Sequence, residues 1–259
     1  MTLKQRLDVL MVARGLADSR AVAQRLILAA EVRVDGQAAT RPSQMVAADS
    51  LVEVARAPAY VSRGGDKLEA ALSSFGLDVA GKTCADAGAS TGGFTDCLLQ
   101  RGASKVFAVD VGLGILHWKL RQDPRVVVME RTNVRYLSSL PVPVDLVTVD
   151  VAFISLRLVL PVVAGWLPDG GDLVALVKPQ FEAGRRSVGK GGVVRDPAVH
   201  RQVLEVVAAA VEEAGLGVQQ LLRSPLRGPK GNVEFLLWAR KGRAQASGLS
   251  EGIEGAVGA

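Results

Sequence analysis

The spacing of apolar residues divides the chain into two parts. In the first part, residues 1–57, apolar residues recur at helical spacing, first at Leu3, Leu7, Leu10 and Met11 and then at Val22, Leu26 and Ile27. Two short β-type runs follow at 32–36 and 51–54, and the first of them ends in an Asp-Gly turn. This pattern predicts a small α+β module of two helices followed by a hairpin.

Beyond a linker expected at 58–62, apolar runs typical of strands alternate with stretches typical of helices. The strands are expected at 83–87, 105–110, 125–129, 144–150, 172–177, 217–222 and 233–239. The helices are expected at 64–75, 92–101, 113–122, 155–164 and 196–214. Such alternation indicates an α/β fold with a parallel, doubly wound sheet over residues 63–241. Residues 242–259 are rich in Gly, Ala and Ser and are expected to form a flexible tail.

Composition excludes several classes of protein. With 49% apolar and 22% charged residues, the chain of 259 residues is expected to be globular. No stretch of 18 uncharged apolar residues is present, and charges interrupt the first apolar stretch, so we expect no membrane contact, no secretion and a cytoplasmic location. Cys84 and Cys97 are the only cysteines, and His117 and His200 are the only histidines. These numbers argue against a disulfide framework and a transition-metal site.

The charge balance suggests a nucleic-acid partner. Lys and Arg number 31 against 26 Asp and Glu, and Arg outnumbers Lys by 22 to 9. Arg binds phosphate through a planar fork and stacks on bases, although a general preference for Arg would give the same count. In the first module we expect RNA contacts from Lys4, Arg6, Arg20 and Arg25; the alternative is a solvated helix face.

The first module also resembles a known domain. The pattern from Leu7-Asp8 to Asp35-Gly36 is similar to the small RNA-binding domain of the S4 type, first described in a ribosomal protein of the small subunit. Ala29-Ala30 stand where many relatives have a glycine. The resemblance implies that this module binds RNA.

The strongest local signal is the segment 83–95, where an apolar run ends in an acidic residue and a glycine-rich loop opens a helix. The spacing of its glycines does not match the dinucleotide fingerprint. A carboxylate before the loop, Asp86, suits the cationic amine of S-adenosylmethionine, and Asp110 after the next strand can accept hydrogen bonds from both ribose hydroxyls. We therefore expect this cofactor to bind at Asp86, Gly88, Ser90, Gly92, Gly93, Phe94 and Asp110. The alternative is an ordinary strand–helix turn without a ligand.

Four further polar residues are expected at one edge of the sheet. Asp150 and Lys178 each end a predicted strand, at the carboxyl edge where ligands of such sheets bind. Glu234 begins the final strand and reaches the same edge if that strand runs antiparallel beside the Lys178 strand. Lys67 begins the helix that precedes the first strand. Each residue alone is typical of a surface ion pair, but the four together indicate a catalytic site.

Those four residues resemble the K-D-K-E tetrad of ribose methyltransferases of the FtsJ class. Longer segments are similar to those of the TlyA family, at 62–68, 86–95, 130–133, 153–156, 177–182 and 231–234. The resemblance covers nearly the whole chain; Tyr60 stands where relatives often carry a tryptophan. It implies a Rossmann-like class I methyltransferase sheet of seven strands, the last antiparallel, and adds Asn133 to the cofactor site. The implied activity is S-adenosylmethionine-dependent 2′-O-methylation of cytidine in ribosomal RNA, with ribosomal subunits as partner and no obligate protein partner.

The chemistry of ribose methylation suggests a role for each residue. Lys178 is expected to remove the hydroxyl proton or to stabilise the developing oxyanion, with Lys67 beside it as a like charge. Asp150 would orient Lys178 and the methyl donor, and Glu234 would orient Lys67 or the substrate. Phe153 can stack on a flipped base, or it can be a core aromatic. Phosphates are expected at Arg63, Arg131 and Arg135.

Two other functions remain open at this stage. The TlyA family carries a haemolysin label, so a pore-forming protein is one alternative, although the sequence offers no membrane span and no secretion signal. A catalytically inactive RNA-binding protein is the other, and the presence of all four tetrad residues argues against it.

Overall fold

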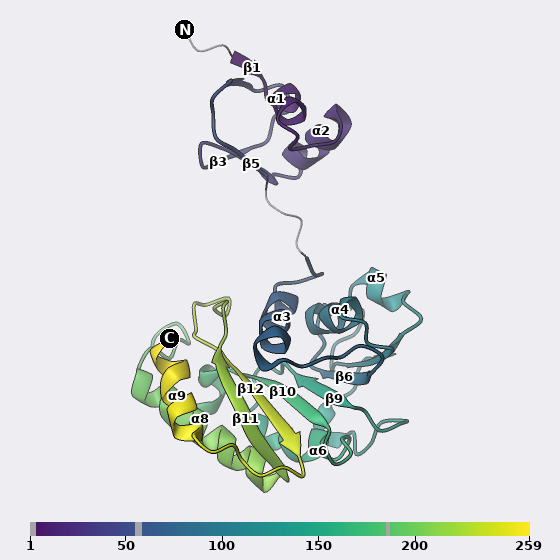
Figure 1. The fold of residues 1–259 in the computed structure, drawn as a ribbon, viewed down its shortest axis with the longest axis vertical. Helices are drawn as coiled ribbons and strands as arrows, with labels where there is room; N and C mark the ends of the chain where they lie inside the picture. The colour runs from purple at the N-terminus through teal and green to yellow at the C-terminus, as the bar shows by residue number, and fades with distance from the viewer. Residues whose placement is uncertain (1–3, 55–58, 185–186) are drawn as a thin grey trace. The chain divides into compact units, whose positions relative to one another are not determined.

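The computed structural model describes residues 4–54, 59–184 and 187–259, and the chain divides into two compact units, Met1–Ala59 and Tyr60–Ala259 (Figure 1). Pro58, the first residue of the expected linker, lies outside the described residues. Tyr60 belongs to the second unit because its ring covers Gly65, where a Cβ would lie 2.2 Å from the ring. Its hydroxyl donates a hydrogen bond to Glu69 over 2.8 Å, so Tyr60 is anchored there rather than being part of a linker.

Between residues 4 and 54, the first unit contains two short helices and five short strands. They are β1 (Lys4–Arg6), α1 (Leu7–Ala13), α2 (Arg20–Leu28), β2 (Val32–Val34), β3 (Gln37–Ala39), β4 (Met45–Ala47) and β5 (Val52–Val54). The strands form a β1–β4 pair and a sheet in the order β3–β2–β5. Both helices pack on these strands through a small core of Leu7, Leu10, Met11, Ile27 and Val32.

Two details of this unit differ from the expectation. Leu3 lies outside the described residues, and the first helix begins at Leu7, because Lys4 to Arg6 form β1, which pairs with β4. The expected hairpin of two strands is a sheet of three, since β2 pairs with both β3 and β5. The Asp-Gly turn is present between β2 and β3, where Asp35 and Gly36 both have positive φ, as a tight hairpin turn requires.

The second unit contains a sheet of seven strands. In chain order its main elements are α3 (Gly64–Phe75), β6 (Thr83–Ala87), α4 (Gly93–Gln100), β7 (Lys105–Val109), α5 (Trp118–Arg121), β8 (Val126–Met129), η1 (Val134–Tyr136), β9 (Leu146–Val149), η2 (Leu156–Leu158), α6 (Leu160–Ala164), β10 (Asp172–Val177), α7 (Pro179–Glu182), α8 (Pro197–Glu213), β11 (Leu216–Arg223), β12 (Phe235–Lys241) and α9 (Leu249–Gly258). The strand order is β11–β12–β10–β9–β6–β7–β8. Only β12 runs against the others, which confirms the predicted α/β sheet with an antiparallel last strand.

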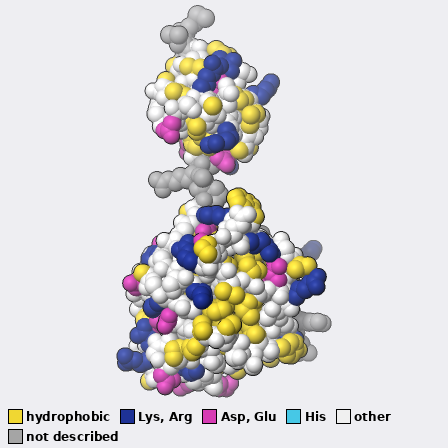
Figure 2. Space-filling model, turned by 90° about the vertical axis from the view of Figure 1, so that its right-hand side faces the viewer, with side chains coloured by type: hydrophobic (Ala, Val, Ile, Leu, Met, Phe, Trp, Pro, Cys, Tyr) yellow, Lys and Arg dark blue, Asp and Glu magenta, His cyan; other side chains and the backbone are white. Residues whose placement is uncertain are grey.

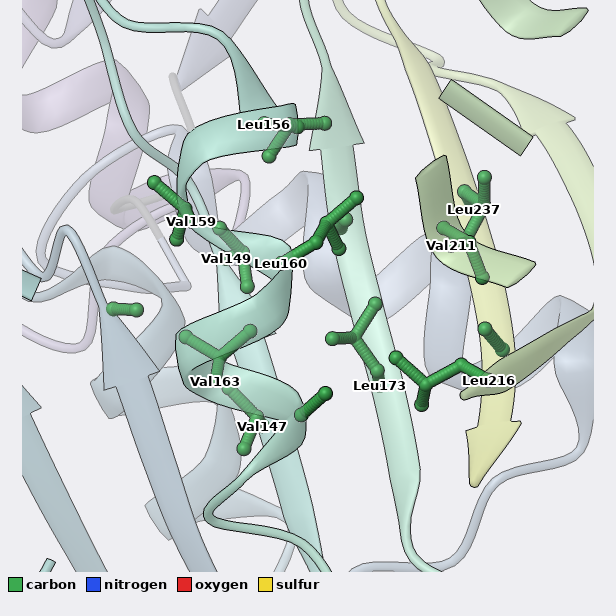
Figure 3. Close-up of a cluster of buried hydrophobic side chains, with 14 of the residues drawn as sticks. Val147, Val149, Leu156, Val159, Leu160, Val163, Leu173, Val211, Leu216 and Leu237 are labelled. Atoms are coloured by element: carbon green, nitrogen blue, oxygen red, sulfur yellow. The ribbon is translucent and has the colours of Figure 1, made fainter. Parts of the chain in front are cut away.

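Helices cover both faces of this sheet, because side chains along each strand alternate between the faces. Cys84, Val106 and Leu146 face the core under α3 and α4, whereas Ala85, Phe107 and Val147 face the core under α6 and α8. Figure 3 shows the second core, in which valine and leucine side chains of α6, β9 and β10 interdigitate. Burial on both faces explains why the strands read as continuous apolar runs.

The end of the chain differs from the expected flexible tail. Residues Leu249–Gly258 form α9, which packs against α8 and β11. Ile253 and Ala256 are buried in the same core as β11, and Glu254 forms an ion pair with Arg201 of α8. The surrounding Gly and Ala obscure the helical spacing of these apolar residues. Within the described part of the chain, no helix is both long and apolar enough to cross a membrane.

Candidate active site

The candidate active site lies where the strand order of the sheet reverses. After β6, the next two strands of the chain, β7 and β8, lie on one side of β6. The following strands, β9 and β10, lie on its other side. Ligands of such sheets bind at the carboxyl ends of the strands that flank this point. Gly88 follows β6 and Asp150 follows β9, and the two segments touch. A Cβ on Gly88 would lie 2.6 Å from the carbonyl oxygen of Asp150, and the φ of Gly88 is +90°, so glycine is required here on two grounds.

A cavity of about 660 Å³ opens beside this contact. Its walls are the glycine loop and the segments that follow β7, β8 and β9. Gly88, Ser90, Asp110 and Asn133 line it, as do Arg135 and Phe153. The carboxylate of Asp110 accepts hydrogen bonds from the backbone N–H groups of Ser90 (2.8 Å) and Gly112 (2.7 Å), which fix its position at the cavity wall. Asn133 caps the short helix η1 by accepting from Arg135 N over 3.1 Å.

A second cavity, of about 270 Å³, adjoins the first and contains the four candidate catalytic residues. Lys67, Asp150, Lys178 and Glu234 all line it, together with Arg63, Gly93 and Phe94. Gly88, Ser90 and Asp150 line both cavities, so the two are neighbouring halves of one cleft. The register of β12 against β10 pairs Phe235 with Val177, which brings Glu234 next to Lys178 at the carboxyl edge.

Each lysine of this cluster has its own carboxylate. Lys67 Nζ lies 2.5 Å from Glu234 Oε2, and both side chains are nearly inaccessible, at 11% and 2% exposure. Lys178 Nζ lies 2.5 Å from Asp150 Oδ1 and donates a hydrogen bond to Val151 O over 2.9 Å. We expected Lys67 beside Lys178 as a like charge, with Asp150 orienting Lys178 and Glu234 orienting Lys67 or the substrate. The structure forms these two ion pairs, so a carboxylate balances the charge of each lysine.

Residues without an assigned role in the sequence analysis hold these groups in place. Asn232 donates from Nδ2 to Gly192 O (2.9 Å) and accepts at Oδ1 from Val194 N (3.0 Å), which anchors the segment before Glu234. Gly228 makes room for the carboxylate, because a Cβ there would lie 2.6 Å from Glu234 Oε1. Asn232 lies within a segment that resembles the TlyA family, which is the one signal that could have identified it.

Glu182 has a similar role on the other side of the cleft. Its carboxylate accepts from Ser155 Oγ (2.6 Å) and from Leu156 N (2.7 Å). It thereby ties α7, which follows Lys178, to the segment that follows Asp150. The loops that carry Lys178 and Asp150 are therefore fixed relative to each other.

The structure places Asp86 differently from the expectation. The side chain is fully buried and lines neither half of the cleft. Its carboxyl accepts hydrogen bonds from the hydroxyls of Thr95 (2.7 Å) and Thr148 (3.2 Å), so it connects β6, α4 and β9 beneath the glycine loop. Burial, together with the nearby Asp150 charge, raises the pKa of Asp86 to about 7.

This buried carboxyl gives a testable dependence of stability on pH. With a raised folded-state pKa, the native state holds a proton that the unfolded state has lost, so the stabilisation is present at low pH and is lost as pH rises towards about 7. Asp86→Asn, which cannot ionise, should gain stability relative to the wild type by about 1.4 kcal/mol per pH unit between pH 5 and 7. Urea unfolding at several pH values measures this difference. The exposed control Glu212→Gln should show no such trend. If the difference in unfolding free energy between Asp86→Asn and the wild type does not change with pH, the raised pKa of Asp86 is contradicted.

Three other residues of the glycine loop have mainly packing roles. Gly92 lies under α5, because a Cβ there would lie 2.2 Å from Leu120 Cδ1. Gly93 lies against the segment before α3, where a Cβ would be 2.3 Å from Ser62 Oγ. Phe94 is buried and closes the wall of the smaller cavity. These residues shape the loop, and the surface that faces the larger cavity comes from Gly88 and Ser90.

The candidate RNA contacts of the second unit lie around the cleft. Phe153 is 91% exposed, so it is not a core aromatic, and its ring lies 5.1 Å from that of Phe181. Its φ of +63° holds a bulky residue in a rarely adopted conformation, which is typical of a functional position. Arg135 lies over the ring of the exposed Tyr136, and Arg131 also has a positive φ. Figure 2 shows Lys and Arg side chains beside apolar ones on one face of this unit.

In the first unit, two of the four candidate RNA contacts are engaged within the protein. Arg6 Nη2 and Arg20 Nε contact the buried Asp8 carboxylate over 3.0 and 2.9 Å. The hydrogen bonds from Arg6, Gln24 and Arg20 hold the pKa of Asp8 well below its usual range. Lys4 and Arg25 are exposed, and neither side chain has a hydrogen-bond partner among the described residues. Arg6 and Arg20 therefore also organise this unit.

Comparisons with known proteins identify chains that are similar to this one over most of its length. TlyA of Mycobacterium tuberculosis, named a 16S/23S rRNA (cytidine-2′-O)-methyltransferase, is 48% identical over 99% of this chain and 97% of its own length. Hemolysin A of Brachyspira hyodysenteriae is 41% identical over 89% of this chain and 98% of its own. A crystal structure from Lactococcus lactis, named a hemolysin, has a TM-score of 0.73 and 46% identity, and the match covers 78% of this chain and 98% of that one.

Family models cover both units of the chain. The S4 domain matches residues 5–52, which carry the two helices of the first unit and its strands up to the start of β5. The FtsJ-like methyltransferase matches residues 60–241, which carry the seven-stranded sheet and the whole cleft. The chain therefore belongs to the FtsJ-like methyltransferase family and carries an S4 domain before its methyltransferase domain.

Proposed function

We propose that the protein transfers a methyl group from S-adenosylmethionine to the 2′-hydroxyl of a cytidine in ribosomal RNA. The observation that carries this proposal is the presence of Lys67, Asp150, Lys178 and Glu234 in one cavity, directly beside the cavity of the glycine loop. The name of the M. tuberculosis relative supports the choice of cytidine and of ribosomal RNA. An enzyme with this substrate acts where ribosomes are found, in the cytoplasm.

The larger cavity suits S-adenosylmethionine in size and in polar groups. Its volume of about 660 Å³ lies in the range typical of cofactor sites. Asp110 presents a carboxylate that two backbone N–H groups hold in place, and such a group can accept hydrogen bonds from ribose hydroxyls. Gly88 brings the loop close to Asp150, which lies between the cofactor side and the catalytic side of the cleft. The cofactor supplies an activated methyl group on a sulfonium.

Lys178 is the group that we assign to the hydroxyl of the substrate. It reaches the cleft from the end of β10, and its contacts with Asp150 and Val151 fix the position of Nζ. From there its ammonium can stabilise the negative charge that develops on the oxygen, or, once it has passed a proton to Asp150, its amine can accept the hydroxyl proton. Asp150 Oδ1 is buried against Lys178 Nζ, so the ion pair with Lys178 fixes the position of this carboxylate. Lys67 and Glu234 close the opposite wall.

The RNA must present its target ribose to this cleft. A nucleotide inside a helix cannot reach the methyl donor, so it has to be extruded, and an exposed aromatic beside the cleft can stack on the extruded base. Phe153 has the exposure and position for this role, with Phe181 supporting its ring. We assign phosphate contacts to Arg63, Arg131 and Arg135 around the cleft, and to Lys4, Arg6, Arg20 and Arg25 in the S4 domain.

A direct test combines methyl transfer with cofactor binding. Wild-type protein should transfer labelled methyl groups to ribosomal RNA within an isolated subunit. Asp110→Ala should weaken S-adenosylmethionine binding by about 10- to 100-fold, because a hydrogen bond to a charged group contributes about 1.5–3 kcal/mol. Calorimetry measures this change, with the exposed carboxylate variant Glu212→Ala as control. Equal affinity of Asp110→Ala and wild type would contradict the cofactor placement, and wild type without transfer to either subunit would overturn the function.

The relative named Hemolysin A gives a second candidate function. A liposome-leakage assay on the same preparation separates the two functions. Leakage without methyl transfer would favour the pore-forming function, whereas transfer without leakage supports the proposal.

A further inference from the structure

A third cavity lies outside the cleft and is strongly basic. Its volume is about 430 Å³, and it lies between the segment before α8, the loop between β11 and β12, and the end of α9. Four basic side chains line it, those of Arg195, Arg223, Arg227 and Lys230, and none of its lining residues is acidic.

Two of these basic side chains have no partner among the residues that the structure describes. Arg195 and Lys230 are exposed, and no hydrogen bond or ion pair engages them within the described part of the chain. Arg227 donates one hydrogen bond, to Gly231 O over 3.3 Å, and Arg223 donates to the backbone carbonyl of Ala259. The nearest carboxylate in sequence, Asp196, is engaged as the N-cap of α8. Like charges that converge on a cavity without an acidic side chain in its lining repel one another, so an anion in the cavity would be stabilised.

The walls of the cavity are held in place by buried contacts. Asn232 links both walls, because it bonds to Gly192 and Val194 on one side and lies between Gly231 and Val233 on the other. His200 is buried, and its Nε2 lies 3.1 Å from Val194 O. These bonds fix the backbone that carries Arg195 and Lys230, so the two charges are presented from a rigid frame.

The same loop also forms part of the active site. Pro229 and Glu234 line the catalytic cavity, whereas Lys230, Gly231 and Val233 line the basic cavity. Four residues of fully extended chain span at most about 14 Å, so the Cα atoms of Lys230 and Glu234 lie within that distance of each other. Phosphates along one strand of a DNA duplex repeat at about 3.4 Å per nucleotide along the axis, and the spacing in RNA is of the same order. The basic cavity is therefore within a few nucleotides of a ribose placed in the cleft.

We infer that this cavity binds a backbone phosphate of the substrate RNA, a few nucleotides from the methylated ribose. The inference rests on the proposed function. Arg side chains match phosphate with their planar forks, and Lys adds a point charge. The lining contains no aromatic side chain other than His200, whose Nε2 is engaged by Val194. The cavity therefore recognises the phosphate and not a base, as expected for a contact that positions RNA.

The test compares two double variants that remove the same charge. Arg195→Gln/Lys230→Gln removes the two unpartnered cations of the cavity. Lys105→Gln/Arg243→Gln removes two exposed cations at the opposite edge of the sheet, at the start of β7 and after β12. Binding to the isolated ribosomal subunit is measured at several salt concentrations. The cavity variant should lower the slope of log K against log salt by about 0.7–0.9 for each phosphate that the protein no longer neutralises. The control variant should retain the wild-type slope.

Two further measurements separate the possible outcomes. S-adenosylmethionine affinity should be equal in all three proteins, because the cofactor site is elsewhere. Inorganic phosphate, titrated in a calorimeter, tests whether a free phosphate is the ligand. If phosphate binds the wild type but not the cavity variant, and both proteins have the same salt slope of subunit binding, the cavity is a site for free phosphate and the proposed RNA contact is wrong. The RNA contact is also wrong if the slopes are equal and phosphate does not bind. If the wild type binds subunits but transfers no methyl group, the proposed function is wrong. The salt dependence of subunit binding would still show whether the cavity contacts RNA.

Discussion

Replacing Lys178 with alanine should lower the rate of methyl transfer by about 10²- to 10⁴-fold, the usual contribution of a positioned acid–base group. The reason is geometric: Lys178 Nζ lies 2.5 Å from Asp150 Oδ1 and donates to Val151 O, so its position in the cleft is fixed before substrate binds. Single-turnover transfer to the ribosomal subunit at saturating S-adenosylmethionine measures the effect.

The control for this prediction keeps the charge. Lys178→Arg retains a cation at the same place but cannot give up its proton in the accessible pH range. If Lys178 accepts the proton, both variants should be slow; if it only stabilises the oxyanion, Lys178→Arg should recover much of the rate. Binding of the cofactor and of the subunit should change little in either variant. A rate near wild type for Lys178→Ala would contradict the assigned role.

Removal of Lys67 alone should destabilise the protein by about 3–5 kcal/mol, because it leaves the carboxylate of Glu234 buried without its partner. The Lys67–Glu234 pair joins residues 167 positions apart, at the start of α3 and the start of β12, and Glu234 is only 2% exposed. The double variant Lys67→Met/Glu234→Gln removes both charges and should recover most of the lost stability. Urea unfolding of the wild type, Lys67→Met and the double variant measures these differences.

The same variants separate folding from catalysis. The double variant should be folded and should bind S-adenosylmethionine, yet it should remain impaired in methyl transfer, because both charged groups that close the catalytic cavity are gone. A double variant with wild-type activity would show that this pair only supports the fold. A double variant as unstable as Lys67→Met would show that the stability arises from the shape of the site rather than from charge pairing.

The order of the elements and the edge of the sheet that carries the site follow from local sequence pattern. Strands buried on both faces read as apolar runs, and helices 64–75 and 196–214 carry a clear helical period, so the alternation of elements is visible without the fold. The expected bounds of strands 83–87 and 172–177 agree with the structure to the residue. Because parallel strands share one carboxyl edge, the pattern also places Asp150 and Lys178 at the same side of the sheet.

The environment of each side chain, in contrast, depends on the tertiary structure. Burial of Asp86, exposure of Phe153 and the pairing of each lysine with its own carboxylate arise from contacts between segments far apart in the chain. The same holds for α9, whose apolar positions acquire a partner only when α8 and β11 lie beside them. The basic cavity is formed by Arg195 and Lys230, 35 positions apart, through the cross-link at Asn232. Local periodicity specifies which face of an element is apolar, whereas charge pairing and burial are fixed by what the fold packs against that face.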